Sequence, residues 1–282
     1  MKTRIKTGVV LGLVVVSMIC IGKAFPGYFI YDLFFSVVGG IAIWEVLHNT
    51  GFVKSKFINV ASIVFTVFNV LTFGQINDYF NIDVTKEYVI AAFLLITYFY
   101  SMFNKHSSAL EPVVAMSFSL ILGYSFGSLL NLLSREAESG FFYMFLCCGF
   151  AWVTDMGAYF VGVTCGKHKL CPELSPKKTV EGAIGGVISC LVIVFAFCEI
   201  FNLCSASYQC NTLNIMIVTA PLSVVSMLGD LVFSYIKRYC GIKDYGTLLP
   251  GHGGILDRFD SVLVISPILY AFTKVLPLIQ KI

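Results

Sequence analysis

Carboxylates and basic residues gather in one stretch of the chain, residues 230–260, which interrupts an apolar sequence. Four polar residues in it are spaced so that they would share one face of a helix: Asp230, Ser234, Lys237 and Arg238. Asp257 and Asp260 would likewise share a face of a second helix, with Arg258 between them. Because Mg²⁺ favours one or two carboxylates together with phosphate oxygens and water, this pattern indicates a site for a divalent cation and phosphate.

A loop rich in glycine and proline joins these two segments. Its members are Gly241, Gly246, Pro250, Gly251, Gly253 and Gly254. Such a loop lets backbone N–H groups approach an anion closely. The alternative is a belt of basic side chains that reach the membrane interface, which would explain Lys237 and Arg238. A belt does not explain Asp230 inside an apolar run, so we favour a binding site.

A second charged stretch covers residues 165–181. Ser175 followed by Pro176 is typical of a helix start, with serine as the N-cap and proline in the first turn. The hydroxyl and basic residues that follow would lie at a helix N-terminus, where phosphate binds well: Lys177, Lys178 and Thr179. A plain capped helix at a membrane surface is the alternative interpretation.

The apolar run before this stretch contributes one more acid. Asp155 and Tyr159 stand at i and i+4, and an ordinary interhelical hydrogen bond would explain them as well as a site does. The segment from Gly162 to His168 superficially resembles a P-loop. It has too few residues between its glycines and lacks the Ser or Thr that binds Mg²⁺. We interpret Gly162 and Gly166 as sites of close helix packing.

The composition places these residues in a membrane. Only 12% of the 282 residues are charged and 57% are hydrophobic, with a mean hydropathy of +0.85. A soluble domain carries about 25% charged residues. The composition therefore excludes a soluble globule and a disordered chain. The net charge of +3 gives no indication of nucleic-acid binding.

Uncharged apolar runs predict an all-α polytopic integral membrane protein with about nine transmembrane helices. The expected helices cover 8–22, 27–47, 57–76, 88–104, 112–133, 141–163, 182–202, 213–236 and 261–279. Asp32 and Glu45 interrupt the second of these runs. Residues 204–212 form a polar dip that we interpret as a turn, and a disulfide between Cys204 and Cys210 stays an open alternative there.

The distribution of basic residues predicts the orientation. The N-terminus and the loops after even-numbered helices hold 14 of the 19 lysines and arginines. Since cytoplasmic loops carry an excess of lysine and arginine, the N-terminus and both charged stretches are expected to face the cytoplasm. A cleaved signal peptide is not favoured, because Lys23 closes the first apolar run and no small-x-small cleavage site follows.

The charged stretches closely resemble the phosphatidate cytidylyltransferases (CDP-diacylglycerol synthases). The resemblance lies first in the motif Ser234-x-Ile-Lys-Arg-x4-Lys243-Asp244-x-Gly-x2-Leu-Pro-x-His252-Gly-Gly-Ile-x-Asp257-Arg258-Phe-Asp260, which is similar to the family signature at every specified position. The stretch from Asp155 to Gly182 resembles the other motif of the family, with Thr154 where many members have asparagine.

The resemblance implies that CTP and phosphatidate react to give CDP-diacylglycerol and pyrophosphate with the help of Mg²⁺. It assigns Asp230 and Asp257 to the metal and allows a second, monovalent cation. The other residues implied in catalysis bind the phosphates or orient groups: Lys237, Arg238, Lys243, Asp244, His252, Arg258 and Asp260. The residues implied in substrate binding are Ser175, Lys177, Lys178, Thr179, Glu181, Asp155, Tyr159, Ser234, Gly253 and Gly254.

The expected partners are CTP, phosphatidate and membrane lipid, without nucleic acid, and a homodimer stays open. We divide the chain into N-terminal transmembrane helices, 1–140, and a catalytic transmembrane region, 141–282, with cytoplasmic loops 164–181 and 237–258. The expected location is the bacterial plasma (inner) membrane. One alternative is a CTP-dependent kinase or cytidylyltransferase acting on another lipid. Another is a cation-coupled transporter, although transport sites tend to lie at the midplane between repeated halves.

Overall fold

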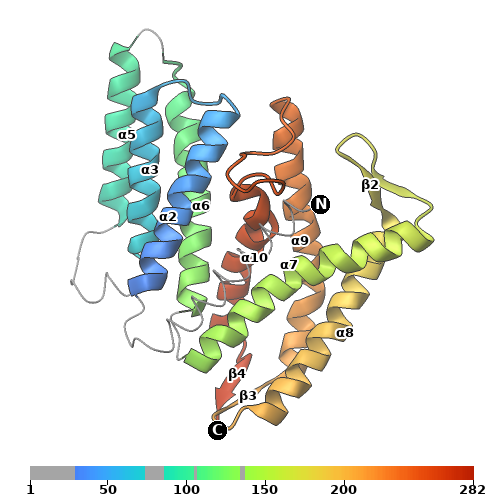
Figure 1. The fold of residues 1–282 in the computed structure, drawn as a ribbon. Helices are drawn as coiled ribbons and strands as arrows, with labels where there is room; N and C mark the ends of the chain where they lie inside the picture. The colour runs from blue at the N-terminus through green and yellow to red at the C-terminus, as the bar shows by residue number, and fades with distance from the viewer. Residues whose placement is uncertain (1–28, 74–85, 105–106, 134–136) are drawn as a thin grey trace. The chain divides into compact units, whose positions relative to one another are not determined.

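The computed structural model describes residues 29–73, 86–104, 107–133 and 137–282, and these contain eight helices and four short strands (Figure 1). The helices are α2 (Phe29–Asn49), α3 (Lys56–Leu71), α5 (Lys86–Phe103), α6 (Glu111–Leu133), α7 (Ala137–Cys165), α8 (Val180–Cys204), α9 (Thr212–Tyr239) and α10 (Leu256–Val275). The strands are β1 (Lys169–Cys171), β2 (Ser175–Thr179), β3 (Tyr208–Cys210) and β4 (Ile279–Lys281).

Each of these helices corresponds to one expected from the sequence, and the expected helix 8–22 lies outside the described residues. Five of the described helices, α2 and α6 to α9, are long and apolar enough to cross a membrane. Helices α3 and α5 are apolar but shorter, and α10 carries four charged residues among its 20. The polytopic class is therefore supported, whereas a total of nine spans and a cytoplasmic N-terminus remain predictions.

The described residues are mostly helical, as expected, and the sequence did not predict the short strands, which form two small antiparallel sheets. Strand β1 pairs with β2, and β3 pairs with β4. The polar dip 204–212 does connect two helices as expected, and it contains β3. Every cysteine among the described residues is a free thiol, including Cys204 and Cys210.

The chain divides into two compact units. In the first, α2, α3, α5 and α6 pack side by side (Figure 1) and the segment Cys240–Phe259 belongs with them. Phe126 of α6 is fully buried in this bundle. It packs so closely on Gly39 of α2 that a Cβ atom added to this glycine would lie 3.4 Å from the Phe126 ring. Small residues at such positions let the helices approach closely.

The second unit contains α7, α8, α9 and Asp260–Ile282. Helices α7 and α8 run in opposite directions and pack through small residues (Figure 1). A Cβ on Gly182 would lie 2.6 Å from the carbonyl oxygen of Ala158, and one on Gly186 would lie 2.7 Å from that of Thr154. A Cβ on Gly162 would lie 3.7 Å from Gly182 Cα, which confirms close helix packing there. Since Gly162 lies inside α7, the segment is not a P-loop.

One sequence-based expectation is wrong: Ser175 does not begin a helix. Residues Ser175–Thr179 form strand β2, and Thr179 is the N-cap of α8, where its hydroxyl oxygen accepts a hydrogen bond from Gly182 N–H at 3.1 Å. The Ser-Pro signal is local, whereas the strand depends on pairing with β1. A two-stranded sheet has free edges, which tolerate Pro176. The lysines therefore lie on a hairpin that leads into the helix.

Candidate functional site

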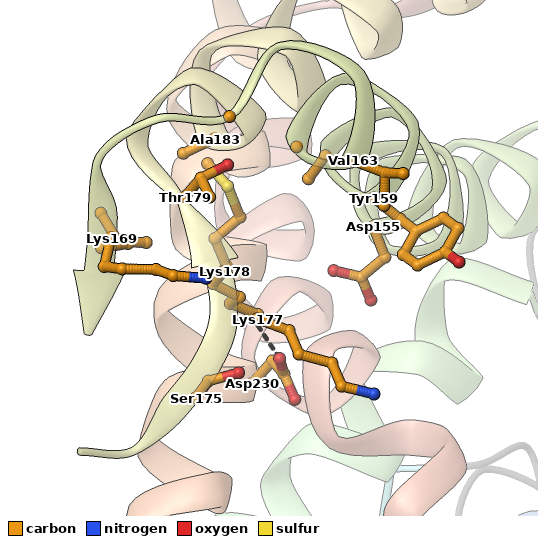
Figure 2. A pocket seen from close by; sticks show the side chains of 15 residues that line it. Asp155, Tyr159, Val163, Lys169, Ser175, Lys177, Lys178, Thr179, Ala183 and Asp230 are labelled. Atoms are coloured by element: carbon orange, nitrogen blue, oxygen red, sulfur yellow. Dashed lines mark hydrogen bonds and ion pairs between the residues drawn. The ribbon is translucent and has the colours of Figure 1, made fainter. Parts of the chain in front are cut away.

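A cavity of about 600 Å³ opens in the second unit (Figure 2). Its wall combines residues of α7, the β1–β2 hairpin, α8 and α9, and the predicted site residues among them are Asp155, Tyr159, Ser175, Lys177, Lys178, Thr179 and Asp230. Lys178 Nζ donates a hydrogen bond to Asp230 Oδ2. The Asp155 carboxylate faces the same space (Figure 2). The fold thus brings two acids, Asp155 and Asp230, and three lysines, those at 169, 177 and 178, from separate parts of the sequence to one cavity.

The hairpin is held beside this cavity by Glu181 in the first turn of α8. Its carboxylate accepts hydrogen bonds from the backbone N–H of Lys167 at 3.0 Å and of His168 at 3.1 Å, and it lies 2.6 Å from His168 Nδ1. Lys169 Nζ donates to the Pro176 carbonyl across the hairpin at 2.7 Å. Glu181, expected to bind substrate, therefore anchors the turn before β1 and shapes the cavity wall.

Thr179 lies where three glycines leave room for it. A Cβ on Gly162, Gly166 or Gly182 would come within 2.9 Å of Thr179 Oγ1. Thr179 is 6% exposed, and its hydroxyl caps α8 while the residue lines the cavity. The N-terminus of a long helix, with its positive dipole end, therefore lies at the cavity wall.

Helix α9 continues to Tyr239, so Ser234, Lys237 and Arg238 follow Asp230 on the helix as the spacing predicts. Helix α10 packs closely against α9 next to Asp230. A Cβ atom added to Gly229 of α9 would lie 2.9 Å from Val264 Cγ2 of α10. Asp260 interacts electrostatically with Asp230 and Lys237. These neighbours extend the charged surroundings of Asp230 within the second unit.

The first unit contains a second cavity, of about 570 Å³, formed by the glycine-rich loop. Its predicted site residues are Lys243, Asp244, His252, Gly253 and Arg258. The loop turns tightly, since His252 N–H donates to Leu249 O at 2.8 Å and Leu249 N–H donates to Gly253 O at 2.9 Å. Gly251 and Gly253 have φ of +79° and +84°, the left-handed region that favours glycine.

Asp257, in the first turn of α10, is only 8% exposed and is fixed by the same loop. Its Oδ2 accepts hydrogen bonds from the backbone N–H of Tyr245 at 2.8 Å and of Gly254 at 2.9 Å. Helix α10 begins earlier than the expected 261, so Asp257 and Asp260 do lie one turn apart on one helix. The predicted residues not among those that line either cavity are Glu181, Ser234, Lys237, Arg238, Gly254, Asp257 and Asp260.

The donor groups suit a cation that arrives with phosphate. Within the described residues, no three His, Cys, Asp or Glu side chains form a cluster able to hold a metal ion. The cavity of the second unit does present Asp155 and Asp230 beside lysines. Mg²⁺ keeps several waters and takes one or two carboxylates plus substrate phosphates, so this donor set fits a Mg²⁺–nucleotide complex.

Glu45 is not among the site residues predicted from the sequence. In the sequence it stands only as a charge that interrupts an apolar run, but in the structure its carboxylate accepts hydrogen bonds from the N–H groups of Ile255 and Leu256. An ionisable residue inside an apolar segment is a signal for function. Its partner could not be named, because the two ends of the contact are 211 residues apart.

Fold and site together define a polytopic membrane protein whose basic, carboxylate-bearing cavities suit phosphate-containing ligands. The model of the family described as "Cytidylyltransferase family" matches residues 2–276. The chain belongs to this family. It is 36% identical over 273 residues to the phosphatidate cytidylyltransferase of Bacillus subtilis (strain 168), covering 96% of each chain.

Two staphylococcal relatives carry the same name. The phosphatidate cytidylyltransferase of Staphylococcus saprophyticus is 33% identical over 272 residues, covering 95% of this chain and 97% of the relative. That of Staphylococcus haemolyticus is 39% identical over 187 residues, covering 65% and 67%. The similarity extends well beyond the two charged stretches.

Proposed function

We propose that this chain is a phosphatidate cytidylyltransferase, which transfers the cytidylyl group of CTP to phosphatidate in phospholipid biosynthesis. The observation that carries the proposal is the cavity at the N-terminus of α8, which is lined by Lys177, Lys178, Asp155 and Asp230. Membership of the cytidylyltransferase family over nearly the whole chain supports it.

The reaction joins two polyanions. A phosphate oxygen of phosphatidate attacks the α-phosphorus of CTP and forms a new P–O bond, while the bond from the α-phosphorus to the bridging oxygen breaks and pyrophosphate leaves. Because the nucleophile is already anionic, no strong general base is needed. Catalysis is then mostly positioning and charge neutralisation.

In this proposal the hairpin binds the nucleotide. Lys177 and Lys178 neutralise the triphosphate, and Ser175 and Thr179 orient it at the positive end of α8. Four basic residues share the phosphates of both substrates: Lys237, Arg238, Lys243 and Arg258. The arginines do so through their planar guanidinium groups. Asp244, His252 and Asp260 orient these groups.

Asp230 and Asp257 would hold Mg²⁺, and a second, monovalent cation is compatible with the same donors. When bound, Mg²⁺ neutralises the developing charge on the transferred group. Asp257 is buried, and its carboxylate accepts hydrogen bonds from the backbone N–H groups of Tyr245 and Gly254. Both observations support a fixed orientation of this carboxylate.

The proposed location is the plasma membrane of a bacterium, with about nine spans and with the N-terminus and site facing the cytoplasm. The positions of 14 of the 19 lysines and arginines on one side of the expected topology support this orientation. The bacterial sources of the relatives support the location.

The test is to incubate membranes containing the protein with Mg²⁺, phosphatidate and CTP labelled either in the base or in the γ-phosphate. The proposal expects base label in lipid and γ-label in pyrophosphate. A CTP-dependent kinase would instead place γ-label in lipid and release CDP. Base label that enters only when another lipid replaces phosphatidate would change the substrate. Vesicle cation flux that needs Asp230 but no CTP would indicate a transporter.

A further inference from the structure

Glu45 makes an unusual contact in the first unit. It lies in α2, is fully buried, and accepts hydrogen bonds from Ile255 N–H at 3.0 Å and Leu256 N–H at 2.9 Å. Helix α10 begins at Leu256, and the first N–H groups of a helix have no partner within it. The preceding Ile255 has no side-chain acceptor. A carboxylate from another helix therefore caps α10.

The loop is built around this carboxylate. A Cβ on Gly246 would lie 2.3 Å from Glu45 Oε1, and one on Gly254 would lie 2.4 Å from Glu45 Oε2. Both glycines therefore stand where a larger residue would displace the carboxylate. One turn along α2, Asn49 Nδ2 donates to the carbonyl oxygen of Tyr245. One face of α2 thus holds the loop near both of its ends.

Glu45 and Asp257 act on adjoining parts of the same backbone. Asp257 accepts from the N–H groups of Tyr245 and Gly254, and Glu45 accepts from the next two N–H groups of the chain. Three consecutive amides, 254 to 256, are therefore fixed by two carboxylates. If Glu45 releases its two amides, the turn that orients Asp257 loses one of its two anchors.

We propose that Glu45 is a positioning residue for cytidylyl transfer: from α2 it fixes the loop 245–256 and the first turn of α10, and through them Asp257. The inference rests on the proposed function, in which Asp257 holds the cation. Residues that orient a metal ligand without touching the metal typically change affinity or activity about 10- to 100-fold when mutated.

The charge and shape of Glu45 both matter for this role. Two divergent N–H donors need two acceptor oxygens, and the positive end of a helix favours an anion. Glutamine in the same place keeps one acceptor but sets its NH₂ group against the other N–H. Glu45→Gln is therefore nearly isosteric and removes one bond and the charge.

The experiment uses the full-length protein purified in detergent, as wild type, Glu45→Gln and Glu111→Gln. Glu111 is the matched control, since it is also buried in the first unit and accepts from two backbone N–H groups, those of Ser55 and Ser108. Two quantities are measured: kcat for cytidylyl transfer, and hydrogen–deuterium exchange of the amides 254–256 without substrates or metal.

For Glu45→Gln we expect kcat to fall about 10- to 100-fold and the amides 254–256 to exchange faster than in the wild type. Glu111→Gln should change neither. Unchanged exchange, kcat within about twofold of wild type, or an equal loss of kcat in Glu111→Gln would each overturn the proposal. A wild type without cytidylyl transfer would overturn the proposed function instead, and the exchange data would still decide whether Glu45 holds the loop.

Gly246→Ala keeps the proposal falsifiable if Glu45→Gln fails to fold. Gly246 has no positive φ, so alanine strains no backbone torsion there, yet its Cβ would lie 2.3 Å from Glu45 Oε1 and must push this carboxylate aside. The same Cβ would make a milder contact with Gly254 Cα, at 3.1 Å. Faster exchange of amides 254–256 and a lower kcat support the proposal, and wild-type values of both overturn it. Where both variants fold, kcat of the double variant should be about that of the less active single variant, because the most severe contact of the alanine Cβ is with the same carboxylate that Glu45→Gln alters.

Discussion

Lys178 of β2 and Asp230 of α9 form an ion pair on the wall of the cavity that Asp155 also lines. Their side chains remain 24% and 23% exposed, so the pair is open to the cavity rather than sealed in a core. An arriving triphosphate can compete for Lys178 and leave Asp230 to a cation. This one contact links the nucleotide and metal parts of the proposed mechanism.

Asp230→Asn tests the acid of this pair. Asparagine keeps the shape and can still accept from Lys178, but it has no charge to offer a cation. We expect turnover to fall at least about 100-fold while the protein still inserts in the membrane. Base-labelled CTP incorporation, normalised to the amount of membrane-inserted protein, measures this.

Glu199→Gln is the control for Asp230→Asn. Glu199 is a carboxylate of α8 that accepts from Thr212 Oγ1 and is not among the residues lining the cavity. Its variant should keep wild-type turnover. Near-normal turnover of Asp230→Asn would remove Asp230 from the metal assignment.

Lys178→Met and Lys177→Met should differ in their effect. Lys178 is paired with Asp230 in the structure, and in the proposed mechanism it donates to the triphosphate instead. The loss of a hydrogen bond to a charged group should lower kcat/KM for CTP by about tenfold or more. Lys177 is exposed, where screening limits a charge to an effect of up to about fivefold. Initial rates over a range of CTP concentrations check this. Equal losses in both variants would contradict a special role for the pair.

Helices were predictable here because a membrane-spanning segment must be apolar over a length that few other structures require. The residues that share one face of a helix were also predictable from the sequence, since Asp230 and Ser234 lie one turn apart on any regular helix. The start of α8 was not predictable. The local Ser-Pro signal at Ser175 competes with pairing to β1, and a strand pairing depends on residues elsewhere in the chain.

Contacts between residues far apart in the chain are the other features that the sequence did not predict. The basic loops predicted that Asp155, Lys178 and Asp230 face one side, but not that Lys178 and Asp230 would pair across 52 residues. Glu45 was visible as a charge in an apolar run, yet its partners are backbone N–H groups, which carry no sequence signature.

Thr179→Val tests the cap of α8. Valine keeps the shape between the three glycines but leaves Gly182 N–H without its acceptor, which should cost about 1 kcal/mol of stability and lower the melting temperature in detergent. Thr179→Ser keeps the hydroxyl and should retain more stability than Thr179→Val. Thr164→Val is the control, because Thr164 is an exposed residue of α7 whose hydroxyl donates to its own helix at Phe160 O. A melting temperature of Thr179→Val equal to that of Thr164→Val would contradict the cap.

Asp257→Asn separates the loop-holding role of Asp257 from its proposed role at the cation. The carbonyl oxygen of asparagine can replace Oδ2 as acceptor for Tyr245 N–H and Gly254 N–H, so the loop should keep its exchange protection. The charge is lost, so turnover should fall at least about 100-fold, and excess Mg²⁺ should not restore it. Hydrogen–deuterium exchange of the loop and base-labelled CTP incorporation give the two measurements. Lost protection would show that the carboxylate charge is needed to hold the loop, and near-normal turnover would take Asp257 out of the metal site.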